Sequence, residues 1–479
     1  MVTSGGGARE PRIGHQALID TSDSDAISDD HSIPSDEDKA GHRAVRSLVF
    51  LACASLVVIC FGMSFTGTRD SGFTIKMVRI PRLRTQRLDL GGNLPLGGDF
   101  RRSGEYSMVI WLGNAGEELP FTVQVDTGSA ILGLPSVGCK GCRHNVHPWY
   151  AHKGATPVPC ENDLNVNCSH CVQQMHCGYN LSYYDGAGFE GMVYQDRMSF
   201  GVGDGYSGLS TTVFVSAIYK MTDNFQPHNI DGIIGFADDG DSIDGSRPPP
   251  FEGLIAAGKL ENIFAMCMHD TGGRMYFGSD ARAAAQRIAS ATSELVQWVK
   301  LTSDNFYPIE MLDMKVNGAS IGVHHSHYNE GLAIIDSGCT DIQLVAPAFN
   351  ALRDTFFEIC RTGVVLKGVC DPMHDGPANI TLFDSGLPCF SMTTADLNAF
   401  PTLQFQFSNG VELELEPLHY LRNGSAFCDD GQYGLAFQSD GPVGSGTLLG
   451  DTFMQPFLTI FDRENKRVGF IKTPEPLCG

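Results

Sequence analysis

A short motif that recurs inside a long internal repeat limits what this chain can fold into. Triplets of the form Asp-Ser/Thr-Gly begin at Asp70, Asp126, Asp270, Asp336 and Asp384. Only the triplets at Asp126 and Asp336 belong to the repeat: each follows an apolar run and precedes, at a similar distance, a second apolar segment that ends at Gly235 or Gly450. An apolar strand that runs into a Gly-bearing turn presents its Asp at the rim of a β-lobe. The repeat therefore predicts two similar lobes that each supply one carboxylate.

Two carboxylates brought together in this way have a specific chemistry. Gly128 and Gly338 lack a Cβ, so the two backbones can approach closely. Neighbouring carboxyl groups do not both ionise readily, so they share a proton and their pKa values separate. The ionised Asp can then remove a proton from water while the protonated Asp polarises a carbonyl group. We therefore predict that Asp126 and Asp336 are catalytic and need neither a metal nor another cofactor.

From about residue 75 to its C-terminus the chain resembles the pepsin-like aspartic endopeptidases. Beyond the two Asp motifs, residues 231–236, 448–453 and 461–470 are similar to the family's segments behind each active Asp. The resemblance implies an all-β, bilobal pepsin-like fold with the active-site cleft between two similar lobes. It also implies polypeptide substrates that bind in an extended form.

The resemblance assigns roles to the neighbours of the two Asp residues. Thr127 and Ser337 would cross-link the two loops beneath the carboxylates, and residues 183–191 would form a flap hairpin whose Tyr184 closes over the substrate. The supporting residues expected at the site are Thr127, Gly128, Ser129, Ser337, Gly338 and Cys339. The flap residues expected to bind substrate are Tyr184, Asp185 and Gly186.

Two positions depart from the family pattern. Ser129 fits the hydroxyl residue that bonds the outer oxygen of the first Asp, but the second lobe has Cys339 there, and a thiol is a weaker donor. Gly133 stands where the family often has a Trp that donates to the flap tyrosine, so the flap tyrosine is expected to be held differently. The departures leave an alternative open, namely a catalytically silent binding or inhibitor protein with the same fold.

Composition agrees with an all-β body in two lobes. The 479 residues include 55 Gly and 24 Pro, the apolar runs are short and often alternate, and helical periodicity is scarce. We expect a monomer with an N-terminal lobe over residues 104–295 and a C-terminal lobe over residues 296–479. The formal net charge of −22 argues against nucleic acid as a partner. The acidic residues Asp185, Glu190 and Asp341 could favour a basic substrate side chain, but the preferred interpretation is that they are solvated turn acids.

The residues before the lobes divide into three parts. Residues 1–46 are rich in Gly, Ser and acidic side chains, which predicts a disordered cytosolic tail. Residues 47–65 carry no charge, which predicts a transmembrane signal anchor rather than a cleaved signal or a buried core helix. Residues 66–103 are predicted to be a tether and a basic prosegment, with a juxtamembrane basic patch as the alternative. The sequence thus predicts a single-pass membrane protein of the secretory pathway, with a lumenal body that prosegment cleavage would release.

Cysteine usage indicates an oxidising compartment. Of 15 cysteines, Cys53 and Cys60 lie in the predicted span and Cys339 in the second motif. The remaining cysteines form an even set, which predicts disulfides. They are Cys139, Cys142, Cys160, Cys168, Cys171, Cys177, Cys267, Cys360, Cys370, Cys389, Cys428 and Cys478. Candidate glycosylation sites are Asn167, Asn180, Asn379 and Asn423.

The cysteine-rich insertion at residues 139–177 has a second interpretation. Its Cys-x-x-Cys spacings also permit a four-thiolate zinc site, which leaves a zinc-binding surface module as a third functional alternative. Interleaved cysteines favour disulfides instead. A cysteine-rich insertion at this point is similar to those of nepenthesins and plasmepsin V. The favoured function is an aspartic endopeptidase that processes proteins in the secretory pathway.

Overall fold

The computed structural model describes the body of the protein and one strand that precedes it. The chain divides into two units, residues 1–65 and 66–479, and all described residues lie in the second. The described residues are 73–79, 106–142, 146–161, 164, 166, 168–182, 188–200, 210–222, 230–238, 249–256, 260–269, 272–375, 378–386, 388–423, 428–429, 431–439, 446–474 and 477. The predicted tail (1–46) and the predicted membrane span (47–65) therefore lie outside the described residues.

The expectation of a membrane-anchored chain needs correction. Within the ranges given above, no helix is long and apolar enough to cross a membrane. The longest helix there, α4 (Ala346–Arg361), has 16 residues and buries only one face, whereas a crossing needs about 20 apolar residues. The prediction of a single-pass membrane protein thus finds no support among the described residues, and the predicted span at 47–65 lies outside them.

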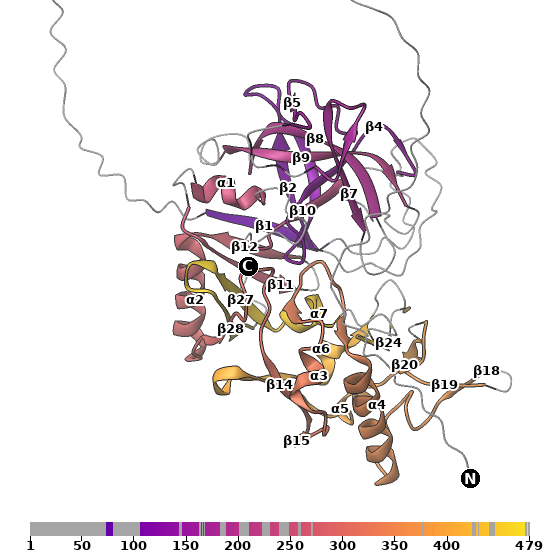
Figure 1. Cartoon of the computed structure of the whole chain (residues 1–479). Helices are drawn as coiled ribbons and strands as arrows, with labels where there is room; N and C mark the ends of the chain where they lie inside the picture. The colour runs from indigo at the N-terminus through magenta and orange to yellow at the C-terminus, as the bar shows by residue number, and fades with distance from the viewer. Residues whose placement is uncertain are drawn as a thin grey trace, which may run out of the picture. The chain divides into compact units, whose positions relative to one another are not determined.

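A 15-stranded sheet joins strands of the N-terminal half to the last strands of the chain. In spatial order its strands are β13 (Gln297–Lys300), β28 (Arg467–Lys472), β27 (Phe457–Asp462), β11 (Ile263–His269), β12 (Gly272–Phe277), β1 (Phe73–Arg79), β2 (Tyr106–Leu112), β3 (Leu119–Asp126), β10 (Gly232–Gly235), β4 (Leu132–Lys140), β9 (Ser210–Met221), β8 (Gly188–Ser199), β7 (His176–Ser182) and β6 (His170–Val172), with β5 (Thr156–Pro157) paired to β8. β11 pairs with β27, and Figure 1 shows yellow β27 beside this part of the sheet. This pairing ties the two halves of the chain together.

Smaller sheets make up the C-terminal half. One contains β15 (Ala319–Ser320), β14 (Met311–Val316), β21 (Leu403–Phe407) and β22 (Glu412–Leu415); a second contains β16 (Ala333–Ile335), β26 (Thr447–Leu449), β17 (Ile342–Leu344) and β25 (Phe437–Ser439); the others are β18 (Met373–Asp375) with β19 (Ala378–Ile380), and β20 (Phe390–Ser391) with β24 (Gln432–Leu435) and β23 (Leu421–Asn423). β22 illustrates why such segments form strands: Leu413 and Leu415 are buried, while the alternating Glu412 and Glu414 are exposed.

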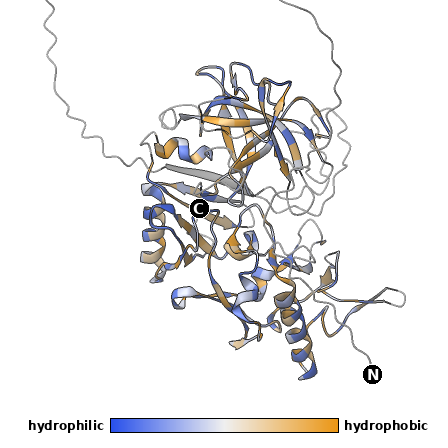
Figure 2. Ribbon diagram, in the orientation of Figure 1, coloured by the Kyte–Doolittle hydropathy of each residue, from blue (hydrophilic) through white to orange (hydrophobic). Residues whose placement is uncertain are grey.

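Helices are few and mostly short, which agrees with the expected all-β bilobal class. They are α1 (Pro250–Ala256), α2 (Ser279–Thr292), α3 (His325–Tyr328), α4, α5 (Thr394–Asn398), α6 (Pro417–Tyr420) and α7 (Asp451–Met454), with 3₁₀ turns η2 (Ser408–Gly410) and η4 (Arg463–Asn465). α4 buries Ala348, Leu352 and Phe356, which recur every fourth residue and so lie on one face. In Figure 2 the hydrophobic orange colour concentrates on the strands of the body.

The internal repeat corresponds to two matching strand pairs. β3 and β10 run parallel, with Gly235 in register with Asp126. β16 and β26 also run parallel, with Ile335 in register with Leu449. In each pair a third strand, β4 or β17, packs antiparallel on the other side of the second strand. The two Asp motifs therefore leave the ends of equivalent strands.

β1 is the described part of the predicted prosegment. It pairs antiparallel with β12 on one side and with β2 on the other, and its register places Phe73 opposite Phe277 and Arg79 opposite Tyr106. The strand thus occupies an interior position of the large sheet. The rest of residues 66–103 lies outside the described residues.

Candidate active site

The two predicted catalytic Asp residues lie together. Asp126 is the last residue of β3 and Asp336 directly follows β16, and their carboxyl groups lie close enough for each to shift the pKa of the other. Gly128 N–H donates to Asp126 Oδ1 and Gly338 N–H donates to Asp336 Oδ1, each at 2.8 Å. The backbone N–H of each Gly thus binds Oδ1 of the Asp two residues before it.

Glycine is required where the two turns meet. A Cβ on Gly128 would lie 2.5 Å from the carboxyl oxygens of Asp336, and a Cβ on Gly338 would lie closer still to Oδ1 of Asp126. Non-bonded carbon and oxygen atoms do not approach so closely. Any side chain at either position would therefore push the two carboxyl groups apart.

Beneath the carboxyl groups, two hydroxyls cross-link the loops. Thr127 Oγ1 donates to the carbonyl oxygen of Ile335 and accepts from the N–H of Ser337, both at 2.9 Å. Ser337 Oγ donates to the carbonyl oxygen of Val125 at 2.7 Å and accepts from the N–H of Thr127 at 3.1 Å. Both residues are fully buried, so the four bonds lie out of reach of water.

Electrostatics makes the two carboxyl groups unequal. Loss of solvation raises the pKa of both, and for Asp336 the negative charge of Asp126 raises the pKa further, well above its usual value. The pKa of Asp126 is held down in part by the hydroxyl of Ser129 and the N–H of Gly128. We therefore expect one shared proton that resides mainly on Asp336, with Asp126 ionised.

Cys339 does not replace the missing hydroxyl. Its thiol donates to the carbonyl oxygen of Asp341 at 3.3 Å instead of to the Asp336 carboxyl group. Burial, and then the charge of Asp336, raise the pKa of this thiol well above its usual value, so it stays protonated. In the part of the chain that the structure describes, Cys339 is the free cysteine. Among the described residues, Asp336 therefore has no hydroxyl donor equivalent to Ser129.

We expect Cys339→Ser to change kcat/KM by less than about tenfold, because the thiol's hydrogen bond goes to backbone and a neutral bond contributes about 0.5–1.5 kcal/mol. Ser129→Ala should cost more, since its hydroxyl donates to an ionised carboxylate. Steady-state hydrolysis of one peptide by the two variants makes the comparison. If Cys339→Ser were the more damaging change, the thiol would have a direct part in the chemistry.

Part of the predicted flap lies outside the described residues, namely Tyr184, Asp185 and Gly186. The strands on either side, β7 and β8, are described. Phe189 on β8 is buried, and its Cζ lies 3.2 Å from the point where a Cβ on Gly133 would stand. The space left by the absent Trp side chain is thus occupied by Phe189.

Two of the acids that could favour a basic substrate side chain have basic partners of their own. Glu190 accepts from Lys220 Nζ. Asp341 is buried, where it pairs with Arg422 at 2.9 Å and accepts from Gln438 Nε2 at 2.6 Å. The idea that Asp341 is an available acid is therefore wrong, because its charge is already neutralised.

Disulfides are confirmed for the described cysteines of the predicted set. The pairs are Cys139–Cys142, Cys160–Cys171, Cys168–Cys177, Cys360–Cys370 and Cys389–Cys428; Cys267 is also disulfide-bonded, and Cys478 lies outside the described residues. The sulfurs proposed as zinc ligands are therefore oxidised. Asn180, Asn379 and Asn423 are exposed, as glycosylation would require, whereas Asn167 lies outside the described residues.

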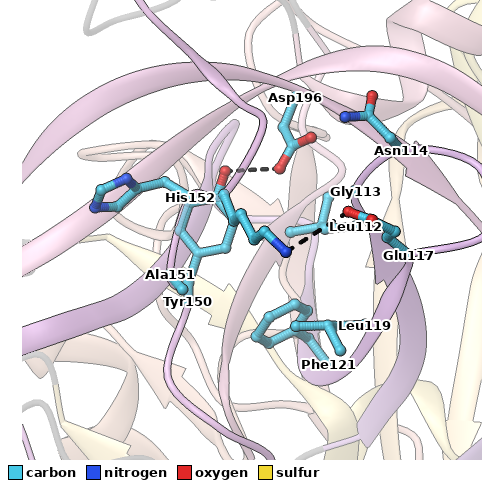
Figure 3. Close-up of a pocket in the computed structure, with 11 residues that line it drawn as sticks. Leu112, Gly113, Asn114, Glu117, Leu119, Phe121, Tyr150, Ala151, His152 and Asp196 are labelled. Carbon is cyan, nitrogen blue, oxygen red and sulfur yellow. Dashed lines mark hydrogen bonds and ion pairs between the residues drawn. The ribbon is translucent and has the colours of Figure 1, made fainter.

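A cavity of about 310 Å³ lies among strands of the N-terminal half and contains none of the predicted site residues (Figure 3). On its wall the Tyr150 hydroxyl donates to Asp196 Oδ2, and the N–H of Arg197 donates to Asp196 Oδ1, both at 2.7 Å. At the rim Lys153 and Glu117 form an exposed ion pair. The buried carboxyl group already has protein donors, so we assign it a structural role.

Tyr150→Phe is expected to destabilise the body by about 1–3 kcal/mol at neutral pH, because a buried carboxyl group loses its hydroxyl donor. Burial raises the pKa of Asp196, so the stability that this group contributes is present at acidic pH and is lost as pH rises through its folded-state pKa. The Tyr150 hydroxyl counteracts this rise by bonding the ionised carboxylate, so its loss should cost less near pH 4, where the carboxyl group takes up a proton, than near pH 7. Thermal unfolding at the two pH values tests this, and an equal cost at both would contradict it.

Sequence reasoning missed the partners of two buried charged groups. Asp231, which begins the segment behind Asp126, accepts three hydrogen bonds, two of them from His147. Arg463, in the C-terminal half, pairs with Asp238 and Glu252 of the N-terminal half. Asp231 and Arg463 belong to the segments that resemble those of the family, residues 231–236 and 461–470, but nothing in the sequence identified their partners.

Comparison with known proteins agrees with this geometry. The chain is 24% identical over 410 residues to Aspartic proteinase 39 of Arabidopsis thaliana, covering 81% of this chain and 78% of the relative. It is 25% identical over 406 residues to Cathepsin D of Dictyostelium discoideum, covering 82% and 90%. The model of the family described as eukaryotic aspartyl protease matches residues 105–473. The match spans both strand repeats and both Asp motifs, and the chain therefore belongs to the eukaryotic aspartyl protease family.

Proposed function

We propose that this protein is an active aspartic endopeptidase whose catalytic residues are Asp126 and Asp336. The observation that carries the proposal is the pair of buried, interacting carboxyl groups at the meeting point of two equivalent strand turns. The inert alternative would have no need of both Asp residues, both close-approach glycines, and the buried Thr127 and Ser337 cross-link. Polypeptides are the substrate class that the family implies.

In the proposed reaction, the two carboxyl groups act together on one water molecule. Asp126 removes a proton from the water as its oxygen bonds to the scissile carbonyl carbon, while Asp336 gives its proton to the carbonyl oxygen. The tetrahedral diol then collapses, a proton passes from Asp126 to the amide nitrogen, and the C–N bond breaks. Asp336 recovers a proton from the diol, so the pair again holds one proton.

We further infer protein processing in the secretory pathway, with the cysteine-rich insertion similar to those of nepenthesins and plasmepsin V. The disulfides and the exposed sequon residues support this route.

We also propose that β1 belongs to a prosegment, because it precedes the family match and lies between β12 and β2. Terminal sequencing after incubation at acidic pH should find a new N-terminus beyond Arg79. A single, unchanged N-terminus in fully active protein would contradict this.

Hydrolysis of a peptide library between pH 3 and 7.5, with and without a statine-type transition-state mimic, tests the proposed activity. We expect cleavage at acidic pH, inhibition by the mimic and no effect of chelators. A folded body with its prosegment removed that cleaves nothing across this range would favour the binding-protein alternative.

A further inference from the structure

We propose that His147 is a positioning residue for Asp126 and acts through the buried carboxylate of Asp231; the inference rests on the proposed function. His147 lies in the cysteine-rich insertion, five residues beyond the Cys139–Cys142 disulfide. Its Nδ1 lies 2.6 Å from Asp231 Oδ2, and its own N–H donates to Asp231 Oδ1 at 2.8 Å. His147 of the insertion thus contacts both carboxylate oxygens of Asp231.

Asp231 depends on these donors. It is fully buried, and a carboxylate removed from water needs a donor for each oxygen. Its third donor is the N–H of Thr122, which bonds Oδ2 at 2.7 Å. Asp231 N–H in turn donates to the carbonyl oxygen of Thr122. The Asp231 side chain therefore joins the insertion to β3, the strand that ends at Asp126.

The connection continues along the backbone to the catalytic residue. β10 begins immediately after Asp231 and runs parallel to β3, with Gly235 in register with Asp126. At its far end the N–H of Phe236 donates to the carbonyl oxygen of Asp126 at 2.7 Å, and the N–H of Ala237 donates to that of Ser129 at 2.9 Å. Asp231 therefore fixes one end of the segment whose other end holds the catalytic loop.

The chain contains a matched control three residues away. The Tyr150 hydroxyl also donates a hydrogen bond to a buried carboxyl group. That group, Asp196, is on β8 and not on the segment behind Asp126. His147→Ala and Tyr150→Phe should both lower thermal stability. Only His147→Ala should lower kcat, by about 10- to 100-fold, because displacement of a reacting group by about 1 Å can cost about 10²-fold. His147→Asn, whose amide N–H can replace Nδ1–H, should restore most of the activity.

The experiment measures kcat and KM for one peptide at a temperature where every variant is folded. Equal kcat for His147→Ala and wild type, or an equal loss in Tyr150→Phe, would overturn the proposal. A wild-type protein without hydrolysis would refute the proposed function instead. In that case amide hydrogen exchange decides the inference: faster exchange at Gly235 and Phe236 in His147→Ala, but not in Tyr150→Phe, supports it, and unchanged exchange refutes it.

Discussion

Replacement of Asp336 by Asn is expected to lower kcat/KM by at least about 10²- to 10⁴-fold, the range that positioned acid–base groups contribute. Asn has nearly the same shape but cannot donate the carboxyl proton to the substrate carbonyl. Asp126→Asn should cause a comparable loss, because it removes the base. Because the two residues act as one pair, the double variant should be little worse than either single variant.

The same substitution should stabilise the body at neutral pH. Burial raises the folded-state pKa of both carboxyl groups, and more strongly that of Asp336. Their contribution to stability is therefore present at acidic pH and is lost as pH rises through the folded-state pKa values. Asn cannot ionise, so the thermal midpoint of Asp336→Asn should exceed that of wild type near pH 7, with little difference near pH 3.

Asp384→Asn supplies the control for both measurements. Asp384 begins another of the Asp-Ser-Gly triplets, but it is exposed and accepts hydrogen bonds from the N–H and hydroxyl of Thr381 in an ordinary turn. Its substitution should leave kcat/KM unchanged. Full activity in Asp336→Asn, or a loss in Asp384→Asn as large as in Asp336→Asn, would remove the assignment of the catalytic pair.

The sequence predicted those features that short segments encode. The strand, the Asp and the Gly turn are contiguous in each copy, so the repeat alone indicated two equivalent lobes and two carboxylates that meet. Short and often alternating apolar runs likewise predicted an all-β body, and the strand Glu412–Leu415 shows this alternation. The catalytic role of Asp126 and Asp336 stays a prediction until hydrolysis is measured.

Features that depend on distant partners could not be predicted. The availability of Asp341 was misjudged because Arg422 and Gln438 approach it from other strands. Cys339 stands where the family has a hydroxyl donor to the second Asp, but its thiol donates to the carbonyl oxygen of Asp341. The pairing of His147 with Asp231 joins residues 84 positions apart, and neither local pattern contains the other. The expectation of a membrane anchor rested on residues 47–65, and the described residues do not support it.

Arg463→Met is expected to destabilise the body by about 3–5 kcal/mol, the usual cost of removing one partner from a buried ion pair. The Arg463 side chain is 1% exposed, and its guanidinium group binds both Asp238 and Glu252. It also stacks 5.6 Å from the centre of the Phe251 ring. Met fills a similar volume but leaves two carboxylates of the N-terminal half without this cation, so the body should unfold at lower urea concentration.

Lys472→Met is the matched control, because Lys472 forms an exposed pair with Glu416 and such pairs contribute about 0–1 kcal/mol. The cost of Arg463→Met should shrink at acidic pH, where carboxylates accept protons and need no cation. Asp238 lies two residues beyond the segment behind Asp126. The activity of Arg463→Met should therefore fall before its global unfolding as urea is raised. Equal urea midpoints for Arg463→Met and Lys472→Met would show that this buried cluster does not hold the two halves together.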